Sequence, residues 1–479
     1  MFATFFHDGR ALALDGGSTS DELADAVVLD PSQSLRASRY NAVYDVDGER
    51  AVVMNTISGA ADVIDASIAE ALKKDQVGKL HVDTRRYLAG RGYLWRSEHD
   101  ELRVIHKLGE GTRDSVRRRQ PLKLLLIPTY RCNLSCTYCW QQPFVKEYYK
   151  DSFDEAMTAS AFSAMLKLEE MEKDRTAYTE LQLFGGEPLL PAVRPLVERA
   201  VQFAAEHGWA LRITTNGMGL ADYLELFAEY PPAEVQITVD GPPEMLRLRR
   251  RGADFEKIAR GIEGLLFYGQ TLVNLRVNLD AANLETLPDL ANILIDRRWF
   301  TNPKFYAYVA PTRDEHFDKR DMYDNRAPML ARYVDLVHQH PQLEIFNVRG
   351  WNGFGDVQHL EQQGVLPRAT FHSCDANLNM FVFDARGMLY ACNEANGRED
   401  RSIGRFHPDL EIDESALAAW RTPAFLQREG CQTCSLMPLC GGGCMISTEG
   451  EDYHAGYCED VKSSFEFSLV DLARRRLAT

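Results

Sequence analysis

Three closely spaced cysteines, Cys132, Cys136 and Cys139, follow the apolar run at residues 122–127. Each iron of a cubane 4Fe-4S cluster needs an outer ligand, which in proteins is usually a cysteine thiolate. A loop that offers three thiolates therefore leaves one iron open to a ligand from elsewhere. We expect the chemistry of the chain at that open position, with these three cysteines as its catalytic residues.

A zinc site is the main alternative for these thiols, and three ordinary buried thiols are another. Structural zinc takes four ligands. No fourth ligand lies close to the three cysteines in the sequence, although a distant residue could supply one. The spacing therefore favours an iron-sulfur cluster.

The residues around this loop resemble the radical S-adenosylmethionine (SAM) superfamily. Tyr138 stands directly before the last cysteine, where that family carries an aromatic residue beside the adenine. The predicted strand at 181–184 runs into Gly185, Gly186 and Glu187, which is similar to the family's Gly-Gly-Glu motif. Glycine lets the backbone approach a ligand closely. The resemblance implies that this strand end holds the ammonium group of the cofactor.

The same resemblance implies a cofactor, a reaction and a partner. The open iron would chelate the amino and carboxylate groups of S-adenosyl-L-methionine. Reduction of that complex would give a 5′-deoxyadenosyl radical, which abstracts hydrogen from a substrate. We expect an external electron donor such as flavodoxin or ferredoxin.

Polar residues end two further predicted strands, in the order that the family shows. The candidate contacts for the cofactor or the substrate are Thr214, Asn216, Thr238 and Asp240. Each could equally be a turn or helix-capping residue. Arg276 shares one face of a predicted strand with Asn278 and could reach the cofactor carboxylate or the substrate. The arginine run of Arg247, Arg249, Arg250 and Arg251 predicts a solvated loop and helix start, whereas the resemblance implies a substrate-facing arginine in this region.

Short apolar strands alternate with amphipathic stretches over residues 121–340. The helical stretches lie near 154–171, 191–206, 219–228, 254–267 and 285–296. After a first strand at 122–127, the strands lie near 180, 211, 236, 275 and 306. This alternation predicts an α/β fold with a parallel sheet and helices outside it. Six strands resemble the partial (β/α)6 barrel of radical SAM enzymes, in which catalytic loops lie at the C-terminal strand ends.

The last third of the chain carries seven more cysteines: Cys374, Cys392, Cys431, Cys434, Cys440, Cys444 and Cys458. Their pattern, C-x12-G-x4-C, then C-x2-C-x5-C-x3-C, then a final C, resembles the SPASM extension, which binds two auxiliary 4Fe-4S clusters. A four-thiolate zinc knuckle at 431–444 is the alternative. The extra cysteines and the upstream loop favour the clusters.

The chain has 10 cysteines. Three clusters with four thiolates each, less the position kept for the cofactor, would need eleven. Carried over by resemblance, the outer auxiliary cluster takes Cys431, Cys434, Cys440 and Cys458, and the inner one takes Cys374, Cys392 and Cys444. The inner cluster then lacks one thiolate. Water, His372, Asp375 or a substrate thiolate could complete it.

A separate unit precedes the predicted barrel. Strands at 40–46 and 51–54 flank Asp47-Gly48, a strong hairpin signal. Helices are expected near 57–73 and 83–91, with a short strand at 93–95. The unit resembles the winged-helix element that binds precursor peptides, in which the leader adds a strand to the sheet edge. A DNA reader is the alternative, but the net charge of −16 and the lack of a basic stripe oppose a nucleic-acid partner.

Five segments result: 1–37, an N-terminal extension; 38–108, the recognition unit; 109–120, a linker rich in Arg and Gly; 121–340, the barrel; and 341–479, the SPASM domain, ending in a helix at 463–477. With 479 residues, 45% of them hydrophobic, the chain has room for three domains. No segment has the length of a membrane span or the pattern of a signal peptide. Cysteines used for clusters indicate a reducing cytoplasm.

The sequence therefore predicts a radical SAM maturase that forms a thioether or carbon-carbon cross-link in a ribosomally made peptide. A sulfatase maturase, which makes formylglycine, is the alternative enzyme. Its pattern places an aspartate after the cysteine that matches Cys392, whereas this chain has Asn393, an amide that cannot take a proton at neutral pH. Glu394 is adjacent and could substitute. A non-catalytic iron-sulfur protein that binds peptides or transfers electrons is the third reading.

Overall fold

Six parallel strands form the centre of the fold. The computed structural model describes residues 34–312, 326–422, 428–446 and 457–478. In spatial order the strands are β13 (Phe305–Pro311), β12 (Leu272–Leu279), β10 (Glu234–Thr238), β9 (Ala210–Thr215), β8 (Thr179–Leu183) and β6 (Leu122–Leu126). Every neighbouring pair is parallel. The predicted strands and their parallel sheet are confirmed.

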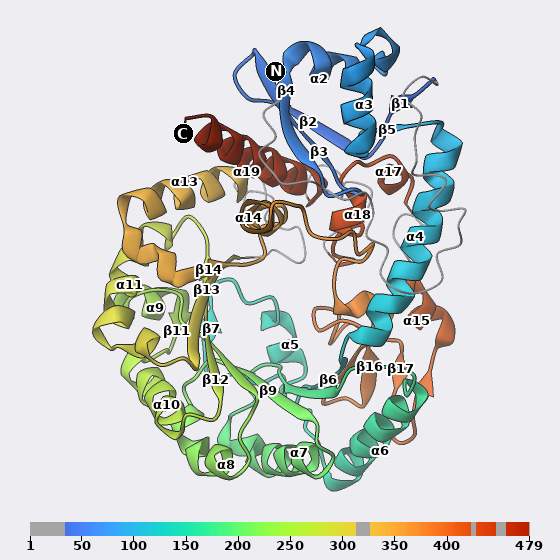
Figure 1. The fold of residues 1–479 in the computed structure, drawn as a ribbon. Coiled ribbons are helices and arrows are strands. Elements are labelled where there is room, and N and C mark those ends of the chain that lie inside the picture. The colour runs from blue at the N-terminus through green and yellow to red at the C-terminus, as the bar shows by residue number, and fades with distance from the viewer. Residues whose placement is uncertain (1–33, 313–325, 423–427, 447–456, 479) are drawn as a thin grey trace.

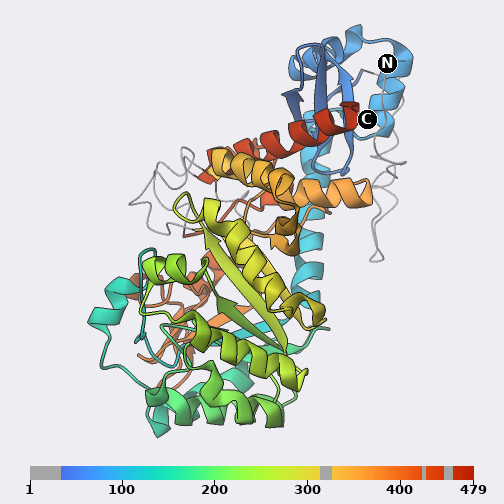
Figure 2. The same cartoon turned by 90° about the vertical axis from the view of Figure 1, so that its left-hand side faces the viewer.

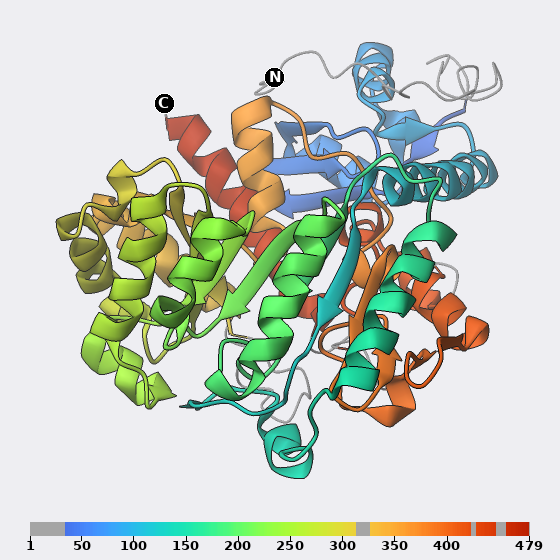
Figure 3. The same cartoon turned by 90° about the horizontal axis from the view of Figure 1, so that it is seen from below.

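Helices cover the outer side of this curved sheet (Figures 1 and 3). They are α6 (Glu155–Met171), α7 (Arg194–Glu206), α8 (Leu224–Glu229), α10 (Phe255–Tyr268) and α11 (Leu287–Asp296). Aspartates cap the N-termini of α6 and α10, where Asp154 and Asp254 accept backbone N–H bonds. In β9, buried Leu211 and Ile213 alternate with partly exposed residues. One face of the sheet therefore packs on the helices, and the other carries polar side chains.

The sheet continues past both ends of the predicted six strands. β14 (Phe346–Val348) pairs in parallel with β13, and β15 (Met380–Phe383) pairs in parallel with β6. From β15 the antiparallel strands β16 (Met388–Tyr390), β17 (Gly404–Arg405) and β18 (Glu411–Ile412) complete an 11-stranded sheet. The cysteine-rich C-terminal part therefore shares its backbone hydrogen bonds with the barrel. Its helices are α13 (Arg326–Gln339), α14 (Phe354–Gln363), α15 (Glu414–Arg421), α17 (Glu429–Gln432) and α18 (Met437–Cys440).

The unit at the N-terminal side is a small sheet packed on two helices. β2 (Asn41–Asp45), β3 (Arg50–Asn55) and β4 (Ala61–Asp65) are antiparallel, and α2 (Ala66–Lys73) and α3 (Val82–Gly90) follow. The hairpin at Asp47-Gly48 is confirmed, with φ of 82° at Gly48. The helix predicted from residue 57 is wrong over 61–65. Its apolar residues form β4, because both faces of that strand are buried.

The predicted extension and linker differ from the structure. Residues 1–33 of the extension lie outside the described residues, whereas Arg36–Ala37 form β1, which pairs with β5 (Leu94–Trp95). The predicted linker at 109–120 is helical, because α4 runs unbroken from Glu98 to Arg119. Ser97 caps α4, acidic residues occupy its first turn and three arginines its last, which suits the helix dipole. This helix spans the distance between the small sheet and the barrel (Figure 2).

The chain ends in α19 (Glu459–Ala478), which confirms the predicted C-terminal helix. α19 lies against the small N-terminal sheet (Figures 1 and 2), where Leu469, Leu472 and Ala473 share a core with Val52 and Val63. At its start, Asp460 forms a buried ion pair with Arg326 of α13, with 3.2 Å between Oδ2 and Nη1. Across the described residues, every helix is too short or too polar to span a bilayer.

Candidate functional site

The loop that carries the first three cysteines is tied to the chain after β10. We call residues 128–141, between β6 and α5 (Gln142–Glu147), the cluster loop. Within it, β7 (Ser135–Cys136) pairs with β11 (Arg250–Arg251), so that Cys136 lies opposite Arg250. The Thr137 N–H also donates to the Arg249 carbonyl at 2.9 Å. This two-strand contact holds the thiols against α9 (Pro243–Arg249), which precedes β11.

The thiols of the cluster loop lie together in a partly buried site. Burial is the largest of the effects that raise the pKa of Cys132 and of Cys136 to about 11, and a neighbouring thiol contributes to each shift. Such thiols are neutral at pH 7, so metal binding must release their protons. Once ionised, three adjacent thiols carry negative charge that a bound cation would offset. They therefore fit an iron-sulfur cluster.

The turn after β8 packs directly on the cluster loop. Gly185 has φ of 121°, which side chains rarely tolerate. The Gly186 N–H donates to the Thr129 carbonyl at 3.1 Å, and a Cβ on Gly186 would lie 2.2 Å from the Arg131 carbonyl oxygen. The sequence predicted that these glycines let the backbone come close to a ligand. In the structure they let the turn come close to the cluster loop.

Glu187 is buried, and its carboxylate accepts three hydrogen bonds. It accepts bonds from the Thr215 hydroxyl at 2.6 Å, the Asn216 N–H at 2.7 Å and the Leu189 N–H at 2.9 Å. Burial raises its pKa, and these donors lower it. Glu187 therefore ties the end of β8 to the end of β9. The contact of this strand end with the cofactor ammonium stays a prediction.

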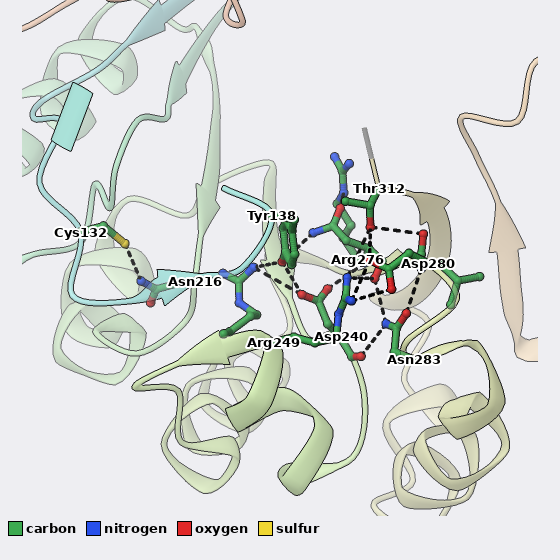
Figure 4. A network of polar contacts seen from close by, with 12 residues as sticks. Cys132, Tyr138, Asn216, Asp240, Arg249, Arg276, Asp280, Asn283 and Thr312 are labelled. Atoms are coloured by element: carbon green, nitrogen blue, oxygen red, sulfur yellow. Dashed lines mark hydrogen bonds and ion pairs between the residues drawn. The ribbon is translucent and has the colours of Figure 1, made fainter. Parts of the chain in front are cut away.

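The end of β9 reaches the thiols through Asn216. Its Nδ2 donates to Asn133 Oδ1 at 2.7 Å and lies 3.7 Å from Cys132 Sγ (Figure 4). Two positions earlier, Thr214 accepts a bond from Gln182 Nε2 at 3.0 Å on the inner face of the sheet. Asn216 therefore belongs to the thiol site, whereas Thr214 lies deeper along the strand.

A buried carboxylate at the end of β10 organises the middle of the site (Figure 4). Asp240 accepts from the Tyr138 hydroxyl and from the Asn278 N–H, the latter at 2.8 Å. Arg250 donates to the same hydroxyl at 2.7 Å, and its Nη1 lies 3.8 Å from Asp240 Oδ2. Burial and the Asp240 charge raise the Tyr138 pKa well above its usual value. Tyr138 is therefore a neutral, fixed side chain. Thr238, also predicted, pairs in register with Arg276.

The arginine run contains two site residues that the sequence reading missed. Arg249 and Arg250 are 5% and 7% exposed, so the predicted solvated loop is wrong for both. Arg249 donates to both oxygens of Asp280 at 2.7 Å, and its guanidinium lies over the Tyr138 ring at 5.0 Å. The pairing of β11 with the cluster loop pulls these residues inward, and such a two-residue ladder leaves no periodic signal in a sequence.

Cations and aromatic rings line the inner face of β12 and β13. Arg276 and Arg349 lie near the same Tyr308 ring, with 6.0 Å and 4.6 Å between guanidinium carbon and ring centroid. Arg276 donates to Asn278 Oδ1 at 2.8 Å, and Tyr308 donates to Gln236 at 2.8 Å. No carboxylate within the described ranges forms an ion pair with either arginine. The inner face therefore offers two cations to a bound anion.

The C-terminal cysteines fall into the two predicted groups. We call Cys374, Cys392 and Cys444 the inner set; burial raises the pKa of Cys374 and of Cys392, and the other thiols of the set raise them further. We call Cys431, Cys434, Cys440 and Cys458 the outer set. In that set burial raises the pKa of Cys440 to about 12 and that of Cys458 to about 11, and neighbouring thiols add to both shifts.

A single zinc ion is the alternative occupant of these thiols. Four thiolates around one zinc, each at about 2.3 Å from it, must lie within roughly 4 Å of one another. Among the residues with described positions, no three potential ligands are close enough to hold one metal ion. A cubane separates its ligands further, so both sets fit clusters better than the zinc knuckle.

Comparison with known proteins agrees with this geometry. The model of the Radical SAM superfamily matches residues 126–294. Mycofactocin maturase MftC of Mycobacterium ulcerans is 26% identical over 337 residues, 68% of this chain and 84% of the relative. The cysteine-type anaerobic sulfatase-maturating enzyme of Clostridium perfringens is 22% identical over 385 residues, 74% of this chain and 97% of the relative.

Two solved structures share the fold. The structure of anSMEcpe with bound AdoMet and Cp18Cys peptide has a TM-score of 0.54 at 18% identity, covering 74% of this chain and all of that one. Streptococcus suis SuiB bound to precursor peptide SuiA has a TM-score of 0.50 at 14% identity, covering 87% of this chain and 97% of that one.

Proposed function

We propose, from the premise that this chain is a radical SAM enzyme, that it matures a ribosomally made peptide by closing an intramolecular cross-link. One observation carries the proposal. The three thiols of the cluster loop lie at the edge of the sheet where β8, β9 and β10 end. Ligand sites of parallel sheets lie at the C-terminal strand ends.

The cluster and S-adenosyl-L-methionine together supply, when bound, a 5′-deoxyadenosyl radical that removes a hydrogen atom from the substrate. The chain's own residues provide the seat. Asp240 holds Tyr138 in one orientation, and Arg249 covers its ring, so that an aromatic face is ready for the adenine. The Gly185-Gly186 turn packs its backbone directly on the cluster loop, which fixes the position of the three thiols.

Arg276 and Arg349 would bind the peptide on the inner face. Both guanidinium groups lie against Tyr308. A carboxylate of the substrate would offset their charge through charge-assisted hydrogen bonds, from the half-buried Arg276 and the exposed Arg349. We therefore expect an acidic residue beside the residue that is modified.

Closing the cross-link requires a second electron acceptor. After one hydrogen atom has left the substrate, bond formation releases one more electron and one proton. The inner set would hold the auxiliary cluster that takes the electron, and the proton leaves to solvent. The product then has two hydrogens fewer than the precursor, and an external flavodoxin or ferredoxin supplies the reducing electron for the next turnover.

The small N-terminal sheet would bind the leader. Within the described residues β2 and β4 each pair with β3 alone. An added peptide strand would gain affinity from backbone hydrogen bonds at either edge. The negative charge of the chain disfavours nucleic acid, and ten cysteines without a disulfide suit a reducing cytoplasm.

The proposal is tested on the anaerobically reconstituted chain with dithionite and S-adenosyl-L-methionine. We expect 5′-deoxyadenosine from the native chain and from Ser135→Ala, an exposed residue of the same loop, and none from Cys136→Ala. A precursor peptide encoded beside the gene of this chain should be coexpressed with the enzyme. Its mass spectrum should then show the loss of two hydrogens. An unchanged mass with inverted residues would indicate epimerisation and refute the cross-link.

Oxidation of a cysteine or serine to formylglycine is the second candidate, favoured by the likeness to the Clostridium perfringens enzyme. The residue after Cys392 is Asn393, whose side chain cannot act as a base at neutral pH. A sulfatase peptide with the target cysteine distinguishes the two: its conversion to an aldehyde that a hydrazide captures would support the second candidate.

A further inference from the structure

We propose that the Glu394 carboxylate is the fourth protein ligand of the inner auxiliary cluster. The proposal rests on the proposed function, because it takes the inner set to hold a 4Fe-4S cluster. The chain has 10 cysteines, one fewer than three such clusters require. The missing ligand must therefore be a different side chain, a solvent molecule or a substrate.

Glu394 lies among the thiols of the inner set. Its backbone N–H donates to Cys392 Sγ at 3.3 Å, and its Oε2 lies 3.9 Å from Cys444 Sγ. One residue therefore contacts two thiols of the set, one through its backbone and the other through its carboxylate.

The two side chains predicted from the sequence have other partners. His372 Nδ1 lies 3.1 Å from the Thr370 carbonyl oxygen. The Asp375 carboxylate pairs with Lys123 of β6, with 2.6 Å between Oδ2 and Nζ. Binding iron would break this ion pair, which joins β6 to the C-terminal part. The ion pair disfavours Asp375, whereas the His372 contact leaves Nε2 available. Glu394 is favoured over His372 because it contacts two thiols of the inner set.

Asn393 is the remaining neighbour, with its Oδ1 3.9 Å from Cys392 Sγ. An amide oxygen is neutral, whereas a carboxylate carries the same charge as the thiolate that it replaces. Three thiolates and one carboxylate therefore give the cluster the total charge of an ordinary four-cysteine site. A cation at this place also offsets the repulsion between the carboxylate and three ionised thiols, which stay close together in the fold.

An oxygen ligand makes one iron of the inner cluster different from the other three. Carboxylates are harder ligands than thiolates and suit iron-sulfur centres less well. We therefore expect a more exchangeable iron at this corner, which an added thiol could reach once the carboxylate is removed.

The test compares the native chain with Glu394→Gln, Glu394→Cys and Glu399→Gln after anaerobic reconstitution. Glu399 lies five residues further and is exposed, so its variant controls for loss of a carboxylate in this segment. We expect about twelve irons per chain in the native protein and in Glu399→Gln. Glu394→Gln should lose one iron and show the electron paramagnetic resonance signal of a three-iron cluster. Glu394→Cys should regain the iron and lose that signal.

A thiol titration gives a second readout. β-Mercaptoethanol added together with ferrous iron should restore the fourth iron of Glu394→Gln, and with S-adenosyl-L-methionine bound it should leave the Mössbauer spectrum of the native protein unchanged. Full iron content in Glu394→Gln, with a spectrum equal to that of Glu399→Gln, would overturn the proposal. About four irons in the native chain would instead refute the auxiliary clusters of the proposed function.

Discussion

Substitution of Gly186 by alanine should remove the chemistry while the barrel stays folded. The new Cβ would lie 2.2 Å from the Arg131 carbonyl oxygen and 2.4 Å from that of Tyr130, and both are backbone atoms of the cluster loop. Restoring a 3.0 Å separation from Arg131 moves the loop by about 0.8 Å, because backbone in a close-packed interior cannot rotate away. Overpacking of this kind costs about 1–3 kcal/mol.

The consequence for activity is larger than that for stability. The cluster loop carries all three thiols, and a displacement of about 1 Å can lower a rate by roughly 100-fold. We expect 5′-deoxyadenosine formation to fall by at least about that factor, measured by chromatography under reducing conditions.

Gly48→Ala is the matched control for that substitution. It lies at φ of 82° with no atom within 4 Å of the new Cβ. It should cost about 1–2 kcal/mol of left-handed strain and leave the rate unchanged. A Gly186→Ala enzyme that forms 5′-deoxyadenosine at more than a third of the native rate would refute the close-approach reasoning.

Three further substitutions test the network, the buried ion pair and the inner face. Asp240→Asn leaves the guanidinium of Arg250, which is 7% exposed, without its carboxylate partner. The free energy of unfolding, measured in guanidinium, should fall by about 3 kcal/mol. An unchanged value would contradict the ion pair. Burial raises the Asp460 pKa from 3.8 to about 6, although Arg326 lowers it. The folded state therefore binds the Asp460 proton more tightly than the unfolded state does. The stability that this proton adds is lost as the pH rises. The native chain should therefore lose about 1.4 kcal/mol relative to Asp460→Asn between pH 5 and pH 8 in anaerobic thermal unfolding, and parallel curves would refute the shift. Arg349→Gln should raise the KM for an acidic peptide about tenfold, while 5′-deoxyadenosine formation without peptide stays native; an equal effect on both would remove Arg349 from the substrate site.

The sequence predicted the parts of the fold that carry a strong period or a rare residue pattern. Strands such as β8 and β10 are short apolar runs between amphipathic helices, and their order follows from that alternation alone. The cysteine spacing likewise predicted clusters in the C-terminal part, whereas the division into an inner and an outer set came from the resemblance to the SPASM extension.

Other elements depend on contacts that no local pattern carries. β4 (residues 61–65) was predicted as helix, since its apolar residues match a buried strand and a buried helix equally well. α4 contains Gly109 and Gly111 and many charges, which indicated a linker, but its capped start and its charged ends stabilise it. Arg249 and Arg250 are buried where β11 pairs with the cluster loop, a contact between segments far apart in the sequence.

The pairing of β15 with β6 makes the two thiol-bearing parts of the chain one rigid unit. Tyr130 of the cluster loop donates to Asp384 at 2.8 Å, and Tyr390, two residues before Cys392, donates to the same carboxylate at 3.3 Å. Asp384 is fully buried, and burial raises its pKa. Because parallel strands and a buried carboxylate join both parts, the spacing between the first thiol site and the inner set is fixed by the fold. In the proposed reaction, an electron that leaves the substrate would therefore reach an auxiliary cluster held by the inner set without any domain closure.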